Sequence, residues 1–447
     1  MARRNLTQGD VLIKLTQLTI PMMWGVFMVL SFFLVDTFFI GLLGTNELAA
    51  ISFTFPVVTA TASIAMGLGV GALSVISRAI GRGAKDEVAH YATHSLILAL
   101  VIVIIFVAIG FATIDPLFLA LGANPTLLPM IKQYMEIWYG GMIFLVVPMI
   151  GNSIIRATGD SRIPSLIMTV AALSNAILDP LLIFGLLGFP RLELEGAAWA
   201  SLISRAITFI ASGYVLHYRL KLIDLSRLKP RELWQSWKKI LYIGLPTAGT
   251  NMILPIAAGF ITMIIANYGS DAVAAFGVAS RIEMFFLIPF VALSAGLGPF
   301  MGQNFGARKF SRIKKAIKLT TVFALGWGGF SAVLLWFAGE AITQQINSAP
   351  KVVAYATLYM AVVPISYGAA GIIYTASAGF NALGYPLNAT MLALGRTLFF
   401  SIPLAWLAHN IWGIIGVYSA ISLANLTVGM LAYFWIANKI NRYDSEN

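Results

Sequence analysis

Runs of about twenty apolar residues follow one another along almost the whole chain. A helix of that length is about 30 Å long, which matches the hydrocarbon thickness of a lipid bilayer. Hydrophobic residues make up 59% of the 447 residues and charged residues only 11%, so a water-soluble fold could not bury so much apolar surface. The chain is therefore expected to be an all-α integral membrane protein without a sizeable soluble domain.

The apolar runs predict twelve transmembrane helices, six on each side of the longest polar interruption. We therefore expect an N-terminal lobe over residues 1–217 and a C-terminal lobe over residues 240–447. The segment between them, residues 218–239, carries Lys and Arg with Leu and Trp interspersed. This composition is typical of a helix that lies at the membrane interface.

Basic residues gather in alternate loops. Three of the basic groups are Arg78, Arg82 and Lys85; Arg219, Lys221 and Arg227; and Arg308, Lys309 and Arg312. The opposite loops offer little beyond Lys132, Arg191 and Lys351. Because cytoplasmic loops of membrane proteins are enriched in Lys and Arg, both termini are expected in the cytoplasm of a prokaryotic cell, with the chain in its plasma membrane. The net charge of +11 is then a consequence of topology, and no nucleic-acid partner is expected.

The two halves repeat with a constant offset. Pro21 and Pro246 open the first helix of their respective halves, and 246 − 21 = 225. Residues 43–50 correspond to residues 268–275 at the same offset, and residues 156–159 correspond to residues 381–384. Each repeat contains an even number of spans, so the pseudo-two-fold axis should lie along the membrane normal. Two six-helix lobes with a cavity between them are the plan of a transporter.

Several of these segments resemble one transporter family over essentially the whole chain. The segments are Ile20-Pro21, Val35–Gly41, Leu48–Ser52, Gly67–Gly71, Arg156–Asp160, Asn175–Pro180, Gly196–Ser201 and Ala279–Glu283. The chain resembles the multidrug and toxic compound extrusion (MATE) transporters, and within them the DNA-damage-inducible-F-like and archaeal branch. The resemblance implies an antiporter that exports diverse amphipathic, often cationic, drugs in exchange for H⁺ or Na⁺.

Acidic residues inside the predicted spans are the first candidates for coupling. Asp36 lies near the far end of the first span and Asp179 lies within the fifth. Asn175 precedes Asp179 by four residues, so both side chains project from one helix face, roughly 6 Å apart along the axis. A carboxylate at membrane depth is costly and marks a functional site. Two carboxylates and an amide in one pocket can bind Na⁺ through oxygen or exchange a proton.

The resemblance adds two further residues to this site. Ser201 stands where the family usually has Thr, and Asn152 matches a pocket asparagine of the archaeal branch. A bound Na⁺ would therefore have Asp36, Asn175, Asp179 and Ser201 as its ligands. The alternative for Asp36 and Asp179 is that they are ordinary helix-end groups wetted at the outer interface.

The second half carries no acid in its first or fourth predicted span, where Na⁺-binding family members have them. The coupling site is therefore expected in the first lobe. Arg281 and Glu283 lie in the second span of that half; either they face the cavity or, as we expect, they belong to a structural charge network near the cytoplasmic side. Pro21 removes a backbone hydrogen bond and predicts a kink, either static or moving during transport.

Two weaker motifs have bland interpretations. Gly67, Gly69 and Gly71 lie in an apolar helix and predict close helix packing, not a phosphate loop. Asp86, His90 and His94 are spaced four apart at a cytoplasmic helix start, which favours a solvated face over a metal site.

Three functions remain open at this point. The first is the cation-coupled drug exporter, with small-molecule substrates, the bilayer as surroundings, no cofactor besides the ion, and a single chain as the working unit. The second is a flippase for lipid-linked precursors, although the spans hold few basic residues besides Arg205, Arg281 and Arg396 to bind phosphate. The third is an intramembrane enzyme, which is disfavoured because no His lies deep in a span.

The topology can be tested with cysteine labelling, because the native chain contains no Cys. A cysteine introduced near Ser226 should resist a membrane-impermeant thiol reagent in whole cells and react after permeabilisation. The unmodified chain is the background control. Labelling from outside in intact cells would overturn the predicted orientation.

Overall fold

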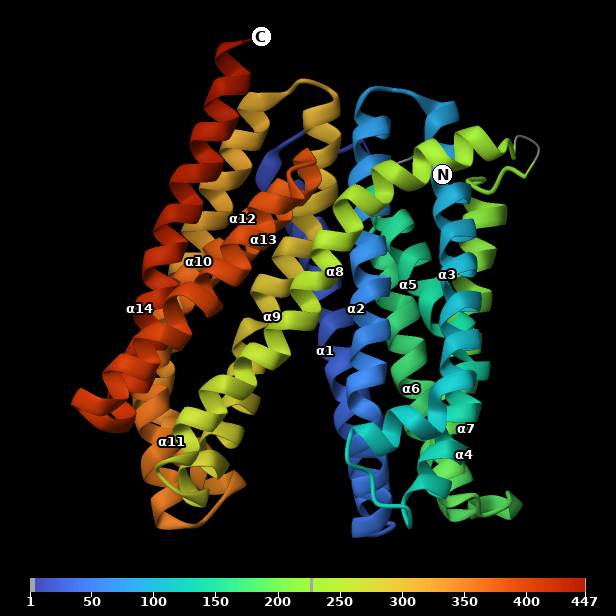
Figure 1. Cartoon of the computed structure of the whole chain (residues 1–447). Coiled ribbons are helices and arrows are strands. Elements are labelled where there is room, and N and C mark those ends of the chain that lie inside the picture. Colours follow the sequence, from blue (N-terminus) through green and yellow to red (C-terminus); the bar gives the residue numbers. More distant parts are fainter. Residues whose placement is uncertain (1–4, 226–227, 447) are drawn as a thin grey trace. The chain divides into compact units, whose positions relative to one another are not determined.

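The computed structural model describes residues 5–225 and 228–446, and all regular structure in these residues is helical, without strands. Figure 1 shows long helices running roughly side by side within each part of the chain. The all-α fold expected from the sequence is confirmed. Ser226, the site proposed for cysteine labelling, lies outside the described residues.

The helices follow one another with short connections. The first half contains α1 (Val11–Gly41), α2 (Thr45–Gly81), α3 (Lys85–Ala120), α4 (Leu128–Gly140), α5 (Met142–Ala157), α6 (Arg162–Phe184), η1 (Leu186–Gly188), α7 (Glu193–Tyr214) and η2 (Val215–Arg219). The second half contains α8 (Pro230–Ala266), α9 (Ser270–Gly306), α10 (Phe310–Ile346), α11 (Pro350–Val362), η3 (Val363–Ser366), α12 (Tyr367–Leu383), α13 (Pro386–Leu394), η4 (Gly395–Ser401) and α14 (Ile402–Ser445).

These helices account for twelve spans. In the described residues, 10 helical stretches are long and apolar enough to cross a membrane, and α4 with α5 forms one more span bent by 47°. The last stretch, Pro386–Ser445, has 60 residues and would be about 90 Å long if straight, three times the hydrocarbon thickness. It breaks at Gly413, whose φ of 62° and ψ of −144° suit a residue without a Cβ. The break divides the stretch into two spans and gives the expected total.

The chain forms two compact units that cut across the repeat. One unit contains Trp24–Ala248, and the other contains Asn5–Met23 together with residues 249–446. The two cuts are separated by 248 − 23 = 225 residues, which is the offset of the repeat. The early part of α1 therefore packs in the unit built mainly from the second half, and the early part of α8 packs in the first unit. The segment 218–239 also belongs to the first unit.

Glycines on α2 allow this packing in the first unit. A Cβ added at Gly67 would lie 2.4 Å from the carbonyl oxygen of Gly244, and one added at Gly71 would lie 2.4 Å from that of Ile240. Both distances are far below van der Waals contact, so a side chain would push α8 away from α2. The predicted packing role of these glycines is confirmed.

The start of α8 and the preceding segment dock on α3. The Nδ1 atom of His94 lies 2.8 Å from Ser236 Oγ, and the indole N–H of Trp237 donates to the His94 carbonyl at 3.0 Å. Thr93 donates to the carbonyl of Leu222 at 3.2 Å. His94 is only 2% exposed, so the expectation of a solvated face is wrong for this residue. The sequence spacing did not reveal that another helix covers it.

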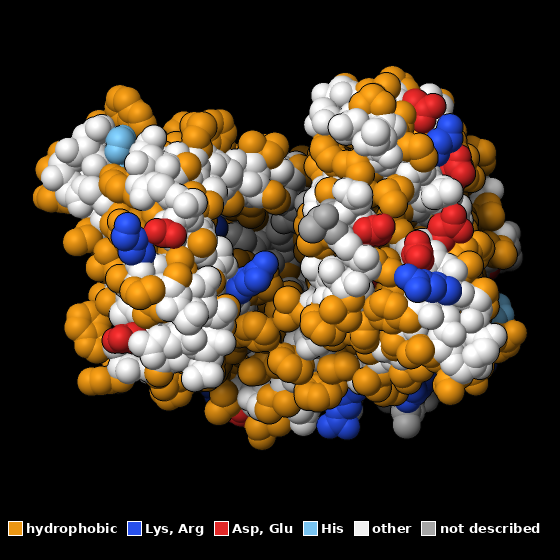
Figure 2. Space-filling view, turned by 90° about the horizontal axis from the view of Figure 1, so that it is seen from below, with side chains coloured by type: hydrophobic (Ala, Val, Ile, Leu, Met, Phe, Trp, Pro, Cys, Tyr) orange, Lys and Arg blue, Asp and Glu red, His pale blue; other side chains and the backbone are white. Residues whose placement is uncertain are grey.

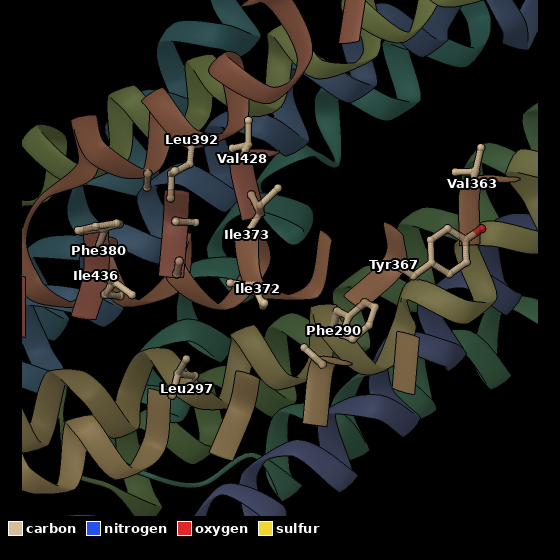
Figure 3. Packing of buried hydrophobic residues seen from close by; sticks show 14 of the residues in the cluster. Phe290, Leu297, Val363, Tyr367, Ile372, Ile373, Phe380, Leu392, Val428 and Ile436 are labelled. Atoms are coloured by element: carbon tan, nitrogen blue, oxygen red, sulfur yellow. The ribbon is translucent and has the colours of Figure 1, made fainter. Parts of the chain in front are cut away.

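The second unit has its own apolar core. Phe290 and Leu297 of α9 pack with Tyr367 and Phe380 of α12 and with Ile436 of α14. Figure 3 shows these side chains interdigitating between the helices. Because apolar side chains also cover much of the visible outer surface (Figure 2), helices of this unit have both inner and outer apolar faces, as a bilayer requires.

The residues before α1 are held on the second unit by cations of the α9–α10 region. The Arg312 guanidinium donates to the carbonyls of Gly9 at 2.6 Å and Leu6 at 3.1 Å, and to Asn304 Oδ1 at 2.9 Å. Hydrogen bonds from the Ile13 N–H and from Lys315 lower the pKa of Asp10. Since the charged form is favoured in the fold, this contact stabilises at neutral pH and is lost as the pH falls through the lowered pKa.

The Arg312→Ala variant should loosen this segment, because several charge-assisted hydrogen bonds disappear together. We expect a loss of about 1–3 kcal/mol, seen as faster amide hydrogen exchange in residues 5–13 and a lower unfolding temperature in detergent. Lys318→Ala removes an exposed cation from the same helix and serves as the control. Equal exchange in both variants would show that Arg312 does not hold the segment.

Candidate functional site

The fifth span, α6, presents Asp179 and Asn175 on one face, as their spacing predicted. The Asn175 amide donates to Asp179 Oδ1 at 3.0 Å, and both side chains are fully buried. Helix α7 packs closely on α6, because Gly196 leaves room for the Leu182 carbonyl; a Cβ there would lie 2.4 Å from that oxygen. The α6–α7 contact keeps both polar side chains away from lipid.

Asp36 lies at the same depth from helix α1. It precedes the end of α1 by 41 − 36 = 5 residues, and Asp179 precedes the end of α6 by 184 − 179 = 5 residues. Both carboxylates therefore lie about 8 Å from helix ends on the same predicted side of the membrane. They are close enough to repel one another electrostatically. The structure brings Asp36, Asp179 and Asn175 together within the first unit.

Three oxygen atoms of this group have no hydrogen-bond partner among the residues that the structure describes. They are Asp36 Oδ1, Asn175 Oδ1 and Asp179 Oδ2, and all three are buried. A buried polar atom without a partner is costly, so such atoms mark places where a proton, an ion or a substrate group binds. The group can accept positive charge, and this is its main chemical capacity.

Two further residues of the group were not predicted as site residues. The guanidinium of Arg205, on α7, lies within electrostatic range of Asp36. Tyr134, on α4, is 7% exposed and lies within electrostatic range of both aspartates and of Arg205. Arg205 had a signal in the sequence, because an Arg in an apolar run needs a counter-charge. Tyr134 had none, because tyrosine is common near membrane interfaces.

The other two predicted residues of the coupling site occupy different positions. Ser201 is buried on α7, 201 − 193 = 8 residues or about 12 Å from the start of that helix, close to the layer of the aspartates. Asn152 lies 157 − 152 = 5 residues from the opposite end of its span, on α5. Since α6 begins at that same end, Asn152 and Asp179 differ in depth by about 17 Å. The structure therefore does not bring Asn152 to the group.

The second unit contains a separate acidic site around Glu283 of α9. The hydroxyl of Tyr359, on α11, donates to Glu283 Oε2 at 2.5 Å, and Arg396 lies within electrostatic range. Glu283 is 283 − 270 = 13 residues from the start of α9 and 306 − 283 = 23 from its end. This differs from the expected network near the cytoplasmic side, because the charge pattern places that side at the end of α9. Arg281 is exposed and points away from this site.

Pro21 lies inside α1, which continues as one helix from Val11 to Gly41. The boundary between the two units follows two residues later, between Met23 and Trp24. Pro246 has the equivalent position in α8, two residues before the boundary between Ala248 and Gly249. Each half therefore has a proline without a backbone N–H donor close to the point where its first helix passes between units.

Comparison with known families gives two matches along the chain. The family model described as MatE matches residues 21–181 and 246–407. The two matches begin 246 − 21 = 225 residues apart, so each covers one repeat of the chain.

Similar proteins are transporters by name. The chain is 38% identical over 432 residues, 97% of this chain and 96% of the relative, to a protein of Shewanella oneidensis named FAD transporter. It is 26% identical to the probable multidrug resistance protein YpnP of Bacillus subtilis, covering 88% of this chain and 87% of that one.

A solved structure has the same fold over nearly the whole chain. The MATE transporter VcmN of Vibrio cholerae in its bent form superposes with a TM-score of 0.91 at 29% identity, covering 97% of this chain and 98% of that chain. The twelve spans, the two repeats and this match agree over the full length. The chain is a multi-pass membrane protein and belongs to the MatE family, the MATE transporters.

Proposed function

We propose that the protein is an antiporter that exports small amphipathic molecules, many of them cationic, in exchange for H⁺ or Na⁺. The observation that carries this proposal is the group of unpartnered buried oxygens on Asp36, Asn175 and Asp179. An acid in the membrane persists where its charge is used, and two acids in one group give a charge that changes with occupancy.

Exchange follows from competition for the same negative charge. When both carboxylates are ionised, the group attracts a cationic substrate from the cytoplasmic side. When the coupling ion arrives from outside and neutralises a carboxylate, that attraction is lost and the substrate leaves. An ion can drive the transporter between its two states only through a difference in affinity for them, and the carboxylates supply this difference.

Several further features belong to the same proposal. Both termini and the segment 218–239 are cytoplasmic, and the chain lies in the plasma membrane of a prokaryotic cell. The acidic group comes entirely from α1, α4, α6 and α7 of one chain, which supports a monomer as the working unit.

The variants Asp36→Asn and Asp179→Asn should each reduce drug efflux by at least about tenfold while leaving membrane expression unchanged, because the amide keeps the shape and removes the charge. Efflux is measured in everted vesicles with a proton gradient or a Na⁺ gradient imposed separately. Asp115→Asn is a matched control, since Asp115 is an exposed acid of the same unit paired with Lys132 at 3.4 Å. Wild-type efflux by either site variant would remove that residue from the coupling group.

Flavin adenine dinucleotide is a second candidate substrate. The relative named FAD transporter is 38% identical to this chain, against 26% for the relative with a multidrug name. The two candidates differ in charge, because FAD carries an anionic pyrophosphate. Export of an anion runs with an inside-negative membrane potential, whereas export of a cation runs against it.

Cells that overproduce the protein should accumulate extracellular FAD several-fold over cells with an empty vector if the flavin candidate is right. Fluorescence of the medium after chromatographic separation of FAD from riboflavin measures this directly. Unchanged extracellular FAD, in cells whose resistance to a cationic dye has risen, would rule the candidate out.

A further inference from the structure

Arg205 places a permanent positive charge inside the first unit. It lies on α7, 205 − 193 = 12 residues or about 18 Å from the start of that helix, in a candidate membrane span. A guanidinium does not lose its proton in proteins, so the charge is present in every state of the transporter. An arginine at this depth requires a counter-charge.

The counter-charge is the acidic group proposed for coupling. Asp36 acts on Arg205, and Asp36 and Asp179 act on one another. The remaining group that faces the guanidinium is the hydroxyl of Tyr134, which is neutral. Arg205 forms none of the direct ion pairs found in the described part of the chain, so it acts on Asp36 across a gap and leaves the carboxylate oxygen without a partner.

The oxygens of this group have the chemistry that Na⁺ uses, but their charge is already shared. A bound Na⁺ beside Asp36 would lie next to a second positive charge that cannot be removed. Coulomb repulsion over several Å inside a protein is worth at least about a tenfold change in a binding constant. Na⁺ also needs several oxygen ligands at once, whereas a proton needs one.

We infer that the guanidinium of Arg205 is the resident cation of the first-unit site and that it excludes Na⁺ from it. The inference rests on the proposed function, because it assigns ion selectivity to the same acidic group. Arg205 is a specificity-determining residue here: it acts on the ion through Asp36 and through repulsion, without binding the ion itself. The family pattern of oxygen ligands is therefore present in this chain, but the surrounding charge does not fit Na⁺.

The test measures Na⁺ binding to the purified full-length protein with ²²Na⁺. The wild type and Arg205→Lys, which retains the charge, should show no saturable Na⁺ binding at physiological concentrations. Arg205→Met, which keeps the length of the side chain without its charge, should gain Na⁺ affinity by at least about tenfold. The gain should disappear in the double variant Arg205→Met with Asp36→Asn, which locates the ion at this site.

The outcomes separate this inference from the proposed function. A folded Arg205→Met protein that gains no Na⁺ binding would overturn the role of Arg205. Should that variant fail to fold, the wild type alone decides: Na⁺ binding that is lost in Asp36→Asn contradicts the inference, and its absence alongside proton-driven efflux supports it. The proposed function fails separately, if Asp36→Asn and Asp179→Asn both export drug at the wild-type rate.

Discussion

The structure depends on one physical constraint: inside a bilayer, a charge or an unpaired backbone group has no water to bind. Helices satisfy the backbone internally, which explains why all regular structure in residues 5–225 and 228–446 is helical. The same constraint explains why the few ionisable side chains within the spans are grouped. Asp36, Asp179 and Arg205 offset one another in the first unit, and Glu283, Tyr359 and Arg396 form a comparable group in the second.

Grouping has a functional consequence. A compensated group can change its total charge by one without leaving an isolated ion in the bilayer, and a transporter needs such a change to couple two fluxes. A fixed arginine in the group sets which ions can supply the change. Selectivity among coupling ions can therefore depend on a residue that is not itself an ion ligand.

The two units also show how repeated halves become one machine. Both α1 and α8 pass from one unit to the other shortly after a proline, at positions separated by the repeat offset. Each unit thus contains a helical segment from the opposite half, held in the first unit by the glycines of α2 and in the second by Gly296, whose missing side chain leaves space for Leu18. A change at Asp36 is covalently linked to the second unit through α1.

Much of this protein can be predicted from its sequence. Apolar runs determine the twelve helices, because hydrocarbon thickness sets their length, and the constant offset determines the repeat. The four-residue spacing of Asn175 and Asp179 places both on one face, since helical periodicity is local. Only the tertiary structure decided what depends on contacts between distant segments. It placed Arg205 and Tyr134 beside Asp36, separated Asn152 from that group, paired Glu283 with Tyr359, and buried His94 under α8. These outcomes depend on how helices rotate and dock, which side-chain volumes and glycine contacts across the whole unit determine together.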